Sequence, residues 1–170
     1  MRRKYGQRIT QDLYWVPFNG GSSLPLKAQF IYADLTEFVL VLSAPSRVVG
    51  RSGFHWGNTS CTVLAGEVNR FSDSTSNIVK ETFKNGQNFR HGQFESYVYE
   101  FGENSYLACY GRGMQPVNAL WPTLGALSNG DVFSLGQLFY VYGRATLDNF
   151  IYSAQHIFDH YKKQVSKQEL

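Results

Sequence analysis

The stretch FESYVYEF, residues 94–101, decides the fold class because it alternates between two kinds of side chain. Successive side chains of a β-strand point to opposite faces, so this alternation predicts a strand with one aromatic face. That face carries Glu95, Tyr97, Tyr99 and Phe101. A turn at Glu103-Asn104 and the apolar residues 105–110 predict a second strand that returns beside the first.

The upstream segments continue this pattern of short strands. Residues 28–44 hold near-continuous apolar runs with a break near Asp34, which is typical of strands buried on both faces. Residues 56–65 predict another strand, and KNGQN at 84–88 predicts a hairpin. Many short strands at regular spacing predict a closed β-barrel or a sandwich.

The C-terminal part changes to helical spacing. Apolar residues recur every three or four positions over 134–145 and again over 150–165. These stretches predict two amphipathic helices that cap the barrel, lie on a membrane, or do both. We therefore predict a mainly β fold with C-terminal helices, in a single domain over residues 1–170. The barrel would cover about residues 12–133 and the capping helices residues 134–166.

The composition points to an apolar ligand. Aromatic residues make up 16% of the 170 residues, whereas charged residues make up only 17%, below the roughly 25% usual in soluble domains. An aromatic surplus is typical of strands and of walls that contact hydrophobic molecules. We expect the interior to form a mostly apolar pocket for a hydrophobic small molecule.

The net charge of +3 is concentrated at the two ends of the chain. These clusters form solvated tails or contact an anionic membrane surface. They consist of Arg2, Arg3, Lys4 and Arg8, and of Lys162, Lys163 and Lys167. The central sequence has no basic stripe, so we expect no nucleic-acid partner. No apolar run approaches the roughly 20 residues that span a bilayer.

The usual catalytic motifs are missing from the sequence. It contains no GxSxG, no HExxH, no phosphate-binding loop and no dinucleotide fingerprint. His156 and His160 are four residues apart, a spacing that suits a metal, but no third ligand accompanies them. We expect neither a metal nor a cofactor.

Glu95 is the most informative ionisable residue. If the aromatic face points inward, the Glu95 carboxyl lies in an apolar space, where burial raises its pKa and lets it act as an acid. The alternative is that Glu95 has a structural role, with its carboxyl satisfied by a backbone amide or an arginine. His91 stands at the entrance of the strand and has a structural or a polarising role. The candidate catalytic residues are Glu95, His91 and Tyr99.

Several strings occur together in one order along the chain. They are Trp15-Val16 with Asn19-Gly20-Gly21, LTEFVL at 35–40, GRSG at 50–53 before Trp56, His91-Gly92, Glu100-Phe101-Gly102 with Asn104, and Tyr110-Gly111-Arg112-Gly113 with Pro116. In this order the sequence resembles the family of fungal C-8 sterol isomerases and animal sigma receptors, from about Trp15 to the end. The resemblance implies a cupin-like β-barrel closed by two C-terminal helices, and a cavity for sterols or lipophilic amines. It also implies homo-oligomers at membranes of the endoplasmic reticulum. If no anchor is missing from the sequence, we expect a cytoplasmic protein instead.

The sequence departs from this family at the cavity acids. Family members carry an Asp five residues after the matching Trp56, and a Glu immediately before the Tyr-Gly-Arg-Gly string. Here these positions hold Cys61 and Cys109, and Phe38 stands where the family has a cavity Tyr. A thiol is a poor acid, and a neutral thiol cannot pair with an ammonium. We expect neither standard sterol isomerisation nor standard amine binding.

The two cysteines allow three interpretations. They are small apolar wall residues, they form a disulfide if their Cα atoms come within about 7 Å, or one is a nucleophile, for which no basic partner is apparent.

The substrate-binding candidates combine the aromatic strand with the positions that the resemblance implies. They are Phe38, Leu40, Leu42, Trp56, Cys61, Tyr97, Phe101, Leu107 and Cys109.

Three functional hypotheses follow from these residues. The favoured one is an isomerase or cyclase of specialised metabolism that folds a terpenoid, polyketide or sterol-like molecule mainly by shape and proximity. The first alternative is a non-catalytic binder of lipophilic ligands, like a sigma receptor. The second is a sterol double-bond isomerase that uses Glu95 as its acid or base.

Overall fold

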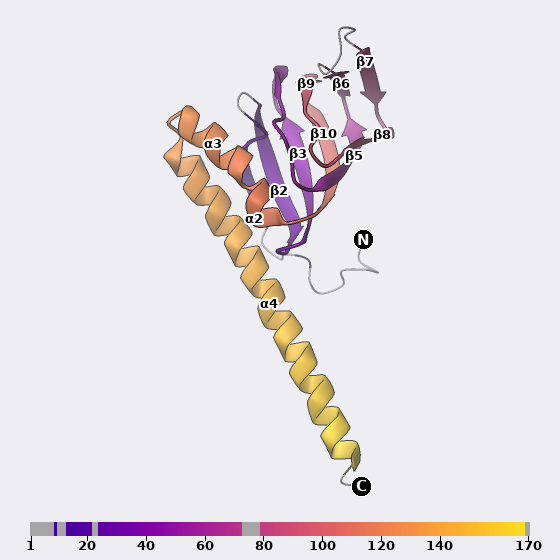
Figure 1. The fold of residues 1–170 in the computed structure, drawn as a ribbon, viewed down its shortest axis with the longest axis vertical. Coiled ribbons are helices and arrows are strands. Elements are labelled where there is room, and N and C mark those ends of the chain that lie inside the picture. Colours follow the sequence, from indigo (N-terminus) through magenta and orange to yellow (C-terminus); the bar gives the residue numbers. More distant parts are fainter. Residues whose placement is uncertain (1–8, 10–12, 22–23, 73–78, 169–170) are drawn as a thin grey trace.

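The computed structural model describes residue 9 and residues 13–21, 24–72 and 79–168, with side chains placed as far as Lys162. Within these ranges two antiparallel sheets are followed by helices (Figure 1). This arrangement confirms the prediction of a mainly β fold with a helical C-terminus. Apart from the exposed Lys162, the basic side chains that were expected to touch solvent or membrane lie outside the described residues. They are Arg2, Arg3, Lys4, Arg8, Lys163 and Lys167.

The larger sheet has six strands in the order β1-β2-β3-β10-β5-β8. In that order they span Trp15–Asn19, Pro25–Ala33, Glu37–Ala44, Ser105–Arg112, Asn58–Ala65 and Asn88–His91. The smaller sheet has four strands in the order β4-β9-β6-β7. These span Val48–Arg51, Tyr97–Phe101, Glu67–Ser72 and Val79–Lys84. No ladder joins the two sheets among the described residues, so they do not close into the single barrel that the strand pattern predicted.

Strand β10 holds the centre of the larger sheet and pairs with β3 on one side and β5 on the other. Its buried positions alternate along the strand, with Leu107 and Cys109 inside and Tyr106 outside. Because antiparallel partners share a face, this register brings inward residues from three strands together.

Two local predictions can be compared with the strands directly. The apolar run at 28–44 divides into β2 and β3 at Asp34, as its sequence indicated; the Asp34 carboxylate there accepts a hydrogen bond from the Leu35 amide at 2.7 Å. The KNGQN segment does turn, with the Gln87 amide donating to the Lys84 carbonyl at 2.9 Å. The predicted hairpin is wrong, however, because β7 pairs with β6 and β8 pairs with β5.

Three helices follow the strands in the described part of the chain: α2 (Gln115–Asn118), α3 (Leu120–Ser128) and α4 (Val132–Gln168). The two predicted C-terminal helices are one continuous helix, because the intervening residues 146–149 include neither glycine nor proline. Conversely, α2 and α3 occupy residues that the sequence had assigned to the barrel.

Helix α4 is anchored near its middle and then leaves the body of the protein. The Tyr142 hydroxyl donates to the Asp34 carbonyl at 2.6 Å, and the Asn149 amide nitrogen donates to the Ala33 carbonyl at 2.8 Å. Beyond this point the helix extends away from the sheets (Figure 1). A stripe of apolar residues from Leu147 onward is more than half exposed: Leu147, Phe150, Ile151, Ile157, Phe158 and Tyr161. None of the described helices has the length and hydropathy needed to cross a bilayer.

Candidate functional site

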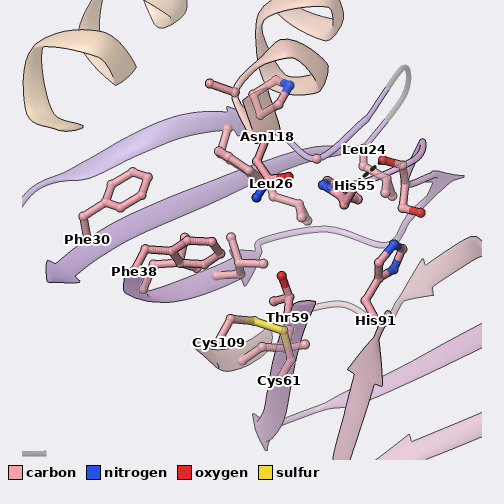
Figure 2. A pocket seen from close by; sticks show the side chains of 18 of the residues that line it. Leu24, Leu26, Phe30, Phe38, His55, Thr59, Cys61, His91, Cys109 and Asn118 are labelled. Atoms are coloured by element: carbon pink, nitrogen blue, oxygen red, sulfur yellow. Dashed lines mark hydrogen bonds between the residues drawn. A yellow bond between two sulfur atoms is a disulfide. The ribbon is translucent and has the colours of Figure 1, made fainter. Parts of the chain in front are cut away.

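A cavity of about 400 Å³ lies on the inner side of the larger sheet, where helices α2, α3 and α4 cover it. Strands β1, β2 and β3 provide one part of its wall, and β5, β8, β9 and β10 provide another. Figure 2 shows Phe30 and Phe38 toward one end of this pocket and His55 and His91 toward the other. Most of the lining side chains are aliphatic or aromatic, so the cavity suits a hydrophobic molecule.

The register of three strands builds the apolar floor. Cys109 of β10 lies opposite Leu40 of β3 and opposite Cys61 of β5. Two residues earlier on β10, Leu107 lies opposite Leu42 of β3. All five side chains line the cavity. An alternating strand places every second residue on one face, so three strands paired in this register give a continuous surface.

Cys61 and Cys109 form a disulfide across the β5–β10 ladder, with their Cα atoms 4.1 Å apart. Of the three interpretations, the structure supports the disulfide, and the bonded sulfur atoms also form part of the wall (Figure 2). A disulfide carries neither an acidic proton nor a nucleophilic thiolate. The positions at which the resemblance implies two acids are therefore uncharged and inert to proton transfer.

Phe38 extends the floor next to a glycine. Gly111 of β10 is its direct partner, and a Cβ at Gly111 would overlap the Phe38 ring. The absence of a side chain at Gly111 lets this ring lie against the backbone. The first glycine of the Tyr-Gly-Arg-Gly string is therefore required because any side chain there would overlap the Phe38 ring.

The polar end of the cavity is built around His91, which is buried. Its Nε2 lies 2.9 Å from the Glu95 carbonyl, which can only accept, so Nε2 carries the proton. Its Nδ1, 3.1 Å from the Tyr99 hydroxyl, must then accept the Tyr99 proton. Burial is the main cause that lowers the pKa of His91 to about 4, and the neighbouring His55 and Arg70 act in the same direction. His91 is therefore neutral at physiological pH, with both nitrogens occupied.

His55 packs edge-on against His91, with ring centroids 4.9 Å apart. Its Nε2 lies 3.0 Å from the Ser52 carbonyl and donates to it. Burial lowers the pKa of His55 as well, although the bond to Ser52 opposes the shift. Two neutral imidazoles thus stand together at one end of an apolar pocket.

The structure brings most of the sequence-predicted site residues to this one cavity. Those that line it are Phe38, Leu40, Leu42, Cys61, His91, Tyr99, Phe101, Leu107 and Cys109. Three others are not among the lining residues. Trp56 packs against Phe94 at 6.5 Å between centroids, and Tyr97 lies beneath the Arg70 guanidinium at 4.4 Å. The third is Glu95.

The prediction that Glu95 points into an apolar space is wrong. Glu95 is exposed and precedes β9, which begins only at Tyr97. Its carboxylate accepts a hydrogen bond from the Gly92 amide at 2.6 Å, so the alternative of a carboxyl satisfied by a backbone amide fits the structure. The alternation does not extend to Glu95 because residues 93–94 form a turn, in which Phe94 has a left-handed φ of 61°, and β9 begins only at Tyr97.

Sequence reasoning missed several cavity residues. The helices contribute Asn118, Leu138, Phe139 and Tyr142, and strands β1 and β2 contribute Phe18, Leu26 and Phe30. His55 and Thr59 were missed too, although both flank Trp56 in a segment that had been singled out. The alternation through β5, on which Thr59 and Cys61 share a face, is the signal that could have found Thr59.

Comparison with known proteins places this chain in a family. The family model described as "ERG2 and Sigma1 receptor like protein" matches residues 1–154. The chain belongs to this family. The match confirms the resemblance that the sequence motifs indicated.

Curated relatives in the ERG2 and sigma-1 receptor-like family include two vertebrate receptors. Sigma non-opioid intracellular receptor 1 of Xenopus tropicalis is 30% identical over 155 residues, covering 86% of this chain and 66% of that protein. The Danio rerio protein of the same name is 29% identical over 118 residues, covering 68% of this chain and 52% of that protein. This chain therefore spans 52–66% of the length of these relatives.

Solved structures with a similar arrangement include cupins. An RmlC-like cupin from Shewanella frigidimarina has a TM-score of 0.49 at 13% identity, covering 62% of this chain and 89% of that chain. KdgF from a Halomonas species has a TM-score of 0.45 at 8% identity, covering 61% of this chain and 91% of that chain.

Proposed function

We propose that this chain binds an uncharged lipophilic molecule of terpenoid, polyketide or sterol type in the cavity beneath helices α2, α3 and α4. The observation that carries the proposal is the cavity itself: about 400 Å³ walled mainly by aliphatic and aromatic side chains. Membership of the ERG2 and sigma-1 receptor-like family supports lipophilic ligand binding.

The absence of charge in this wall argues for an uncharged ligand. Cys61 and Cys109 are joined as a disulfide, and the lining residues include neither a carboxylate nor a lysine or arginine among those that the structure describes. An ammonium group moved from water into such a wall would lose its hydration without gaining a counter-charge. Neutral molecules lose much less on entry, so they are the ligands that the cavity favours.

Native mass spectrometry of the purified chain tests this proposal, with extraction of any bound neutral lipid. Leu42→Trp places a large ring inside the cavity and is expected to abolish lipid binding. Val41→Trp, on the same strand but not among the cavity residues, is the matched control and should still bind. Retention of lipid by a folded Leu42→Trp variant would contradict binding in this cavity.

A second candidate function is conversion of the bound molecule by shape. A pericyclic cyclisation rearranges the electrons of one molecule and needs no external proton donor, which suits a wall whose two expected acids are a disulfide. Holding the reacting carbons together lowers a barrier by several kcal/mol, about 7–11 kcal/mol in the most favourable intramolecular cases. The exposed position of Glu95 does not favour the alternative in which it is the acid or base.

Incubation with linear isoprenoid and polyketide precursors, followed by mass spectrometry of the products, separates these alternatives. Conversion that survives Glu95→Gln supports catalysis by shape, and conversion that is lost supports a role for Glu95. Tight binding without any product supports the receptor-like binder.

The location of the protein in the cell can be inferred from its exposed apolar surface. The exposed apolar stripe of α4, from Leu147 to Tyr161, suits contact with a membrane surface. We therefore propose that the protein lies at a membrane such as that of the endoplasmic reticulum, and a homo-oligomer is a further arrangement that would cover apolar surface. Flotation with liposomes and measurement of the mass in solution test these two points.

A further inference from the structure

The polar side chains on the cavity wall differ in whether their hydrogen-bonding capacity is used. The Tyr142 hydroxyl donates to the Asp34 carbonyl at 2.6 Å. The Asn118 amide accepts from the Trp56 backbone and donates to Gln115 at 3.2 Å. Both nitrogens of His91 are occupied by Glu95 and Tyr99, as described above. These groups are fixed by the protein and have little left to offer a ligand.

His55 is different because its bond to the Ser52 carbonyl fixes the tautomer. With the proton on Nε2, the Nδ1 atom is a bare acceptor, and it receives no hydrogen bond from any residue that the structure describes. The ring lines the cavity beside His91. An acceptor facing an apolar space stays unsatisfied unless a ligand or a water donates to it.

Thr59 supplies the complementary group. Its hydroxyl makes no hydrogen bond within the described part of the chain, and Figure 2 shows it pointing from β5 into the pocket. Thr59 is the direct cross-strand partner of His91, so its side chain lies on the same face as His91. His55 and Thr59 therefore both neighbour His91 at one end of the cavity.

We propose that His55 and Thr59 form a subsite for the hydroxyl group of a lipophilic alcohol, whose hydrocarbon body lies along the apolar wall toward Phe30 and Phe38. The alcohol O–H donates to Nδ1 of His55, and the Thr59 hydroxyl donates to the alcohol oxygen. This inference rests on the proposed binding function and adds the ligand's polar group and its anchor.

The pairing of one acceptor with one donor discriminates among ligands. An ether or a hydrocarbon of the same shape cannot donate to His55, so it leaves Nδ1 unpaired. An alkylammonium can donate, but it finds no counter-charge among the lining residues that the structure describes. The site thus prefers an alcohol over both.

The test uses the purified full chain and a neutral fluorescent probe, N-phenyl-1-naphthylamine, displaced by farnesol or by farnesyl methyl ether. We expect farnesol to bind about tenfold more tightly than the ether, the size of effect that one or two neutral hydrogen bonds produce. His55→Phe should bring the ratio close to one without weakening the ether. Thr59→Val should weaken farnesol about threefold, and the ether by a similar factor because an ether oxygen accepts the same hydrogen bond, whereas Thr59→Ser, which keeps the hydroxyl, should preserve both affinities.

Thr62→Val is the matched control, because it removes a hydroxyl from the same strand, β5, at a position that is not among the cavity residues. Its ratio should equal that of the wild type. If His55→Phe does not fold, as judged by circular dichroism, the Thr59→Val and Thr59→Ser pair decides. An equal affinity for alcohol and ether in the wild type, an unchanged ratio in a folded His55→Phe variant, or an unchanged farnesol affinity in Thr59→Val overturns the subsite alone. Failure of the probe and of both ligands to bind overturns the proposed function as well.

Discussion

Cys61 and Cys109 lie directly opposite each other on neighbouring antiparallel strands and are joined by a disulfide that forms part of the cavity wall. The bond therefore links two properties of the protein. It ties the centre of the larger sheet together, and it keeps the floor of the cavity free of acidic groups. Both properties can be tested by breaking it.

The double substitution Cys61→Ala with Cys109→Ala should lower the free energy of unfolding by about 2–4 kcal/mol, the usual effect of a disulfide that closes a loop of this size. The two cysteines are separated by 48 residues in the sequence. Urea denaturation with and without a reductant measures the change. The double variant should not respond to reductant, and a wild-type protein that is equally insensitive would show that the disulfide does not contribute to stability.

Gly111 and Phe38 provide a second test, of packing. A Cβ at Gly111 would overlap the Phe38 ring, so Gly111→Ala should destabilise the protein by about 1–3 kcal/mol, as overpacking of a core usually does. The substitution should also displace the ring and change ligand affinity. Combining Gly111→Ala with Phe38→Leu should recover part of the loss, because the smaller side chain leaves room. Strict additivity of the two changes in unfolding free energy would contradict a direct contact.

The alternation of residues 97–101 could be read from the sequence because it is a local property of one strand. Tyr99 and Phe101 are buried, as this pattern predicted. The same reading failed two residues earlier, at Glu95, which lies between the turn with the left-handed Phe94 and the start of β9 at Tyr97. A single non-glycine residue at positive φ leaves little trace in the sequence, since many residue types occur there at low frequency.

The disulfide and the polar end of the cavity could not be derived from local pattern alone. Cys61 meets Cys109 only because β5 and β10 pair in one particular register, which is set by contacts between distant segments. His55 reaches His91 through the same long-range arrangement. The helix that follows was predicted in two parts because its apolar residues change face around residues 146–149, although nothing there breaks a helix.

Membrane contact by α4 depends on its exposed apolar stripe. Ile157→Glu with Phe158→Glu should weaken binding to liposomes at least about tenfold, because burial of such side chains in an interface contributes about 1.5–3 kcal/mol each. His156→Glu is the control: it introduces one of the two negative charges at a neighbouring position that lies outside the stripe and is also exposed. Equal flotation of the wild type and the double variant would exclude this surface as the point of contact.

The neutral histidines predict how stability varies with pH. The pKa of His91 falls from 6.5 to about 4 on folding, chiefly because of burial, and the pKa of His55 is lowered for the same main reason. Between these limits the unfolded chain binds protons that the folded chain does not, so the unfolded state gains stability as the pH falls. The contribution of His91 is fully present above about pH 6.5 and is lost progressively down to about pH 4. The free energy of unfolding then changes with pH by at most about 1.4 kcal/mol per pH unit for one proton.

Urea denaturation between pH 4 and pH 8 should show this slope in the wild type and a smaller slope in His91→Asn, with His55→Asn also reducing it. Parallel curves for the wild type and both variants would show that neither histidine is kept neutral by the fold.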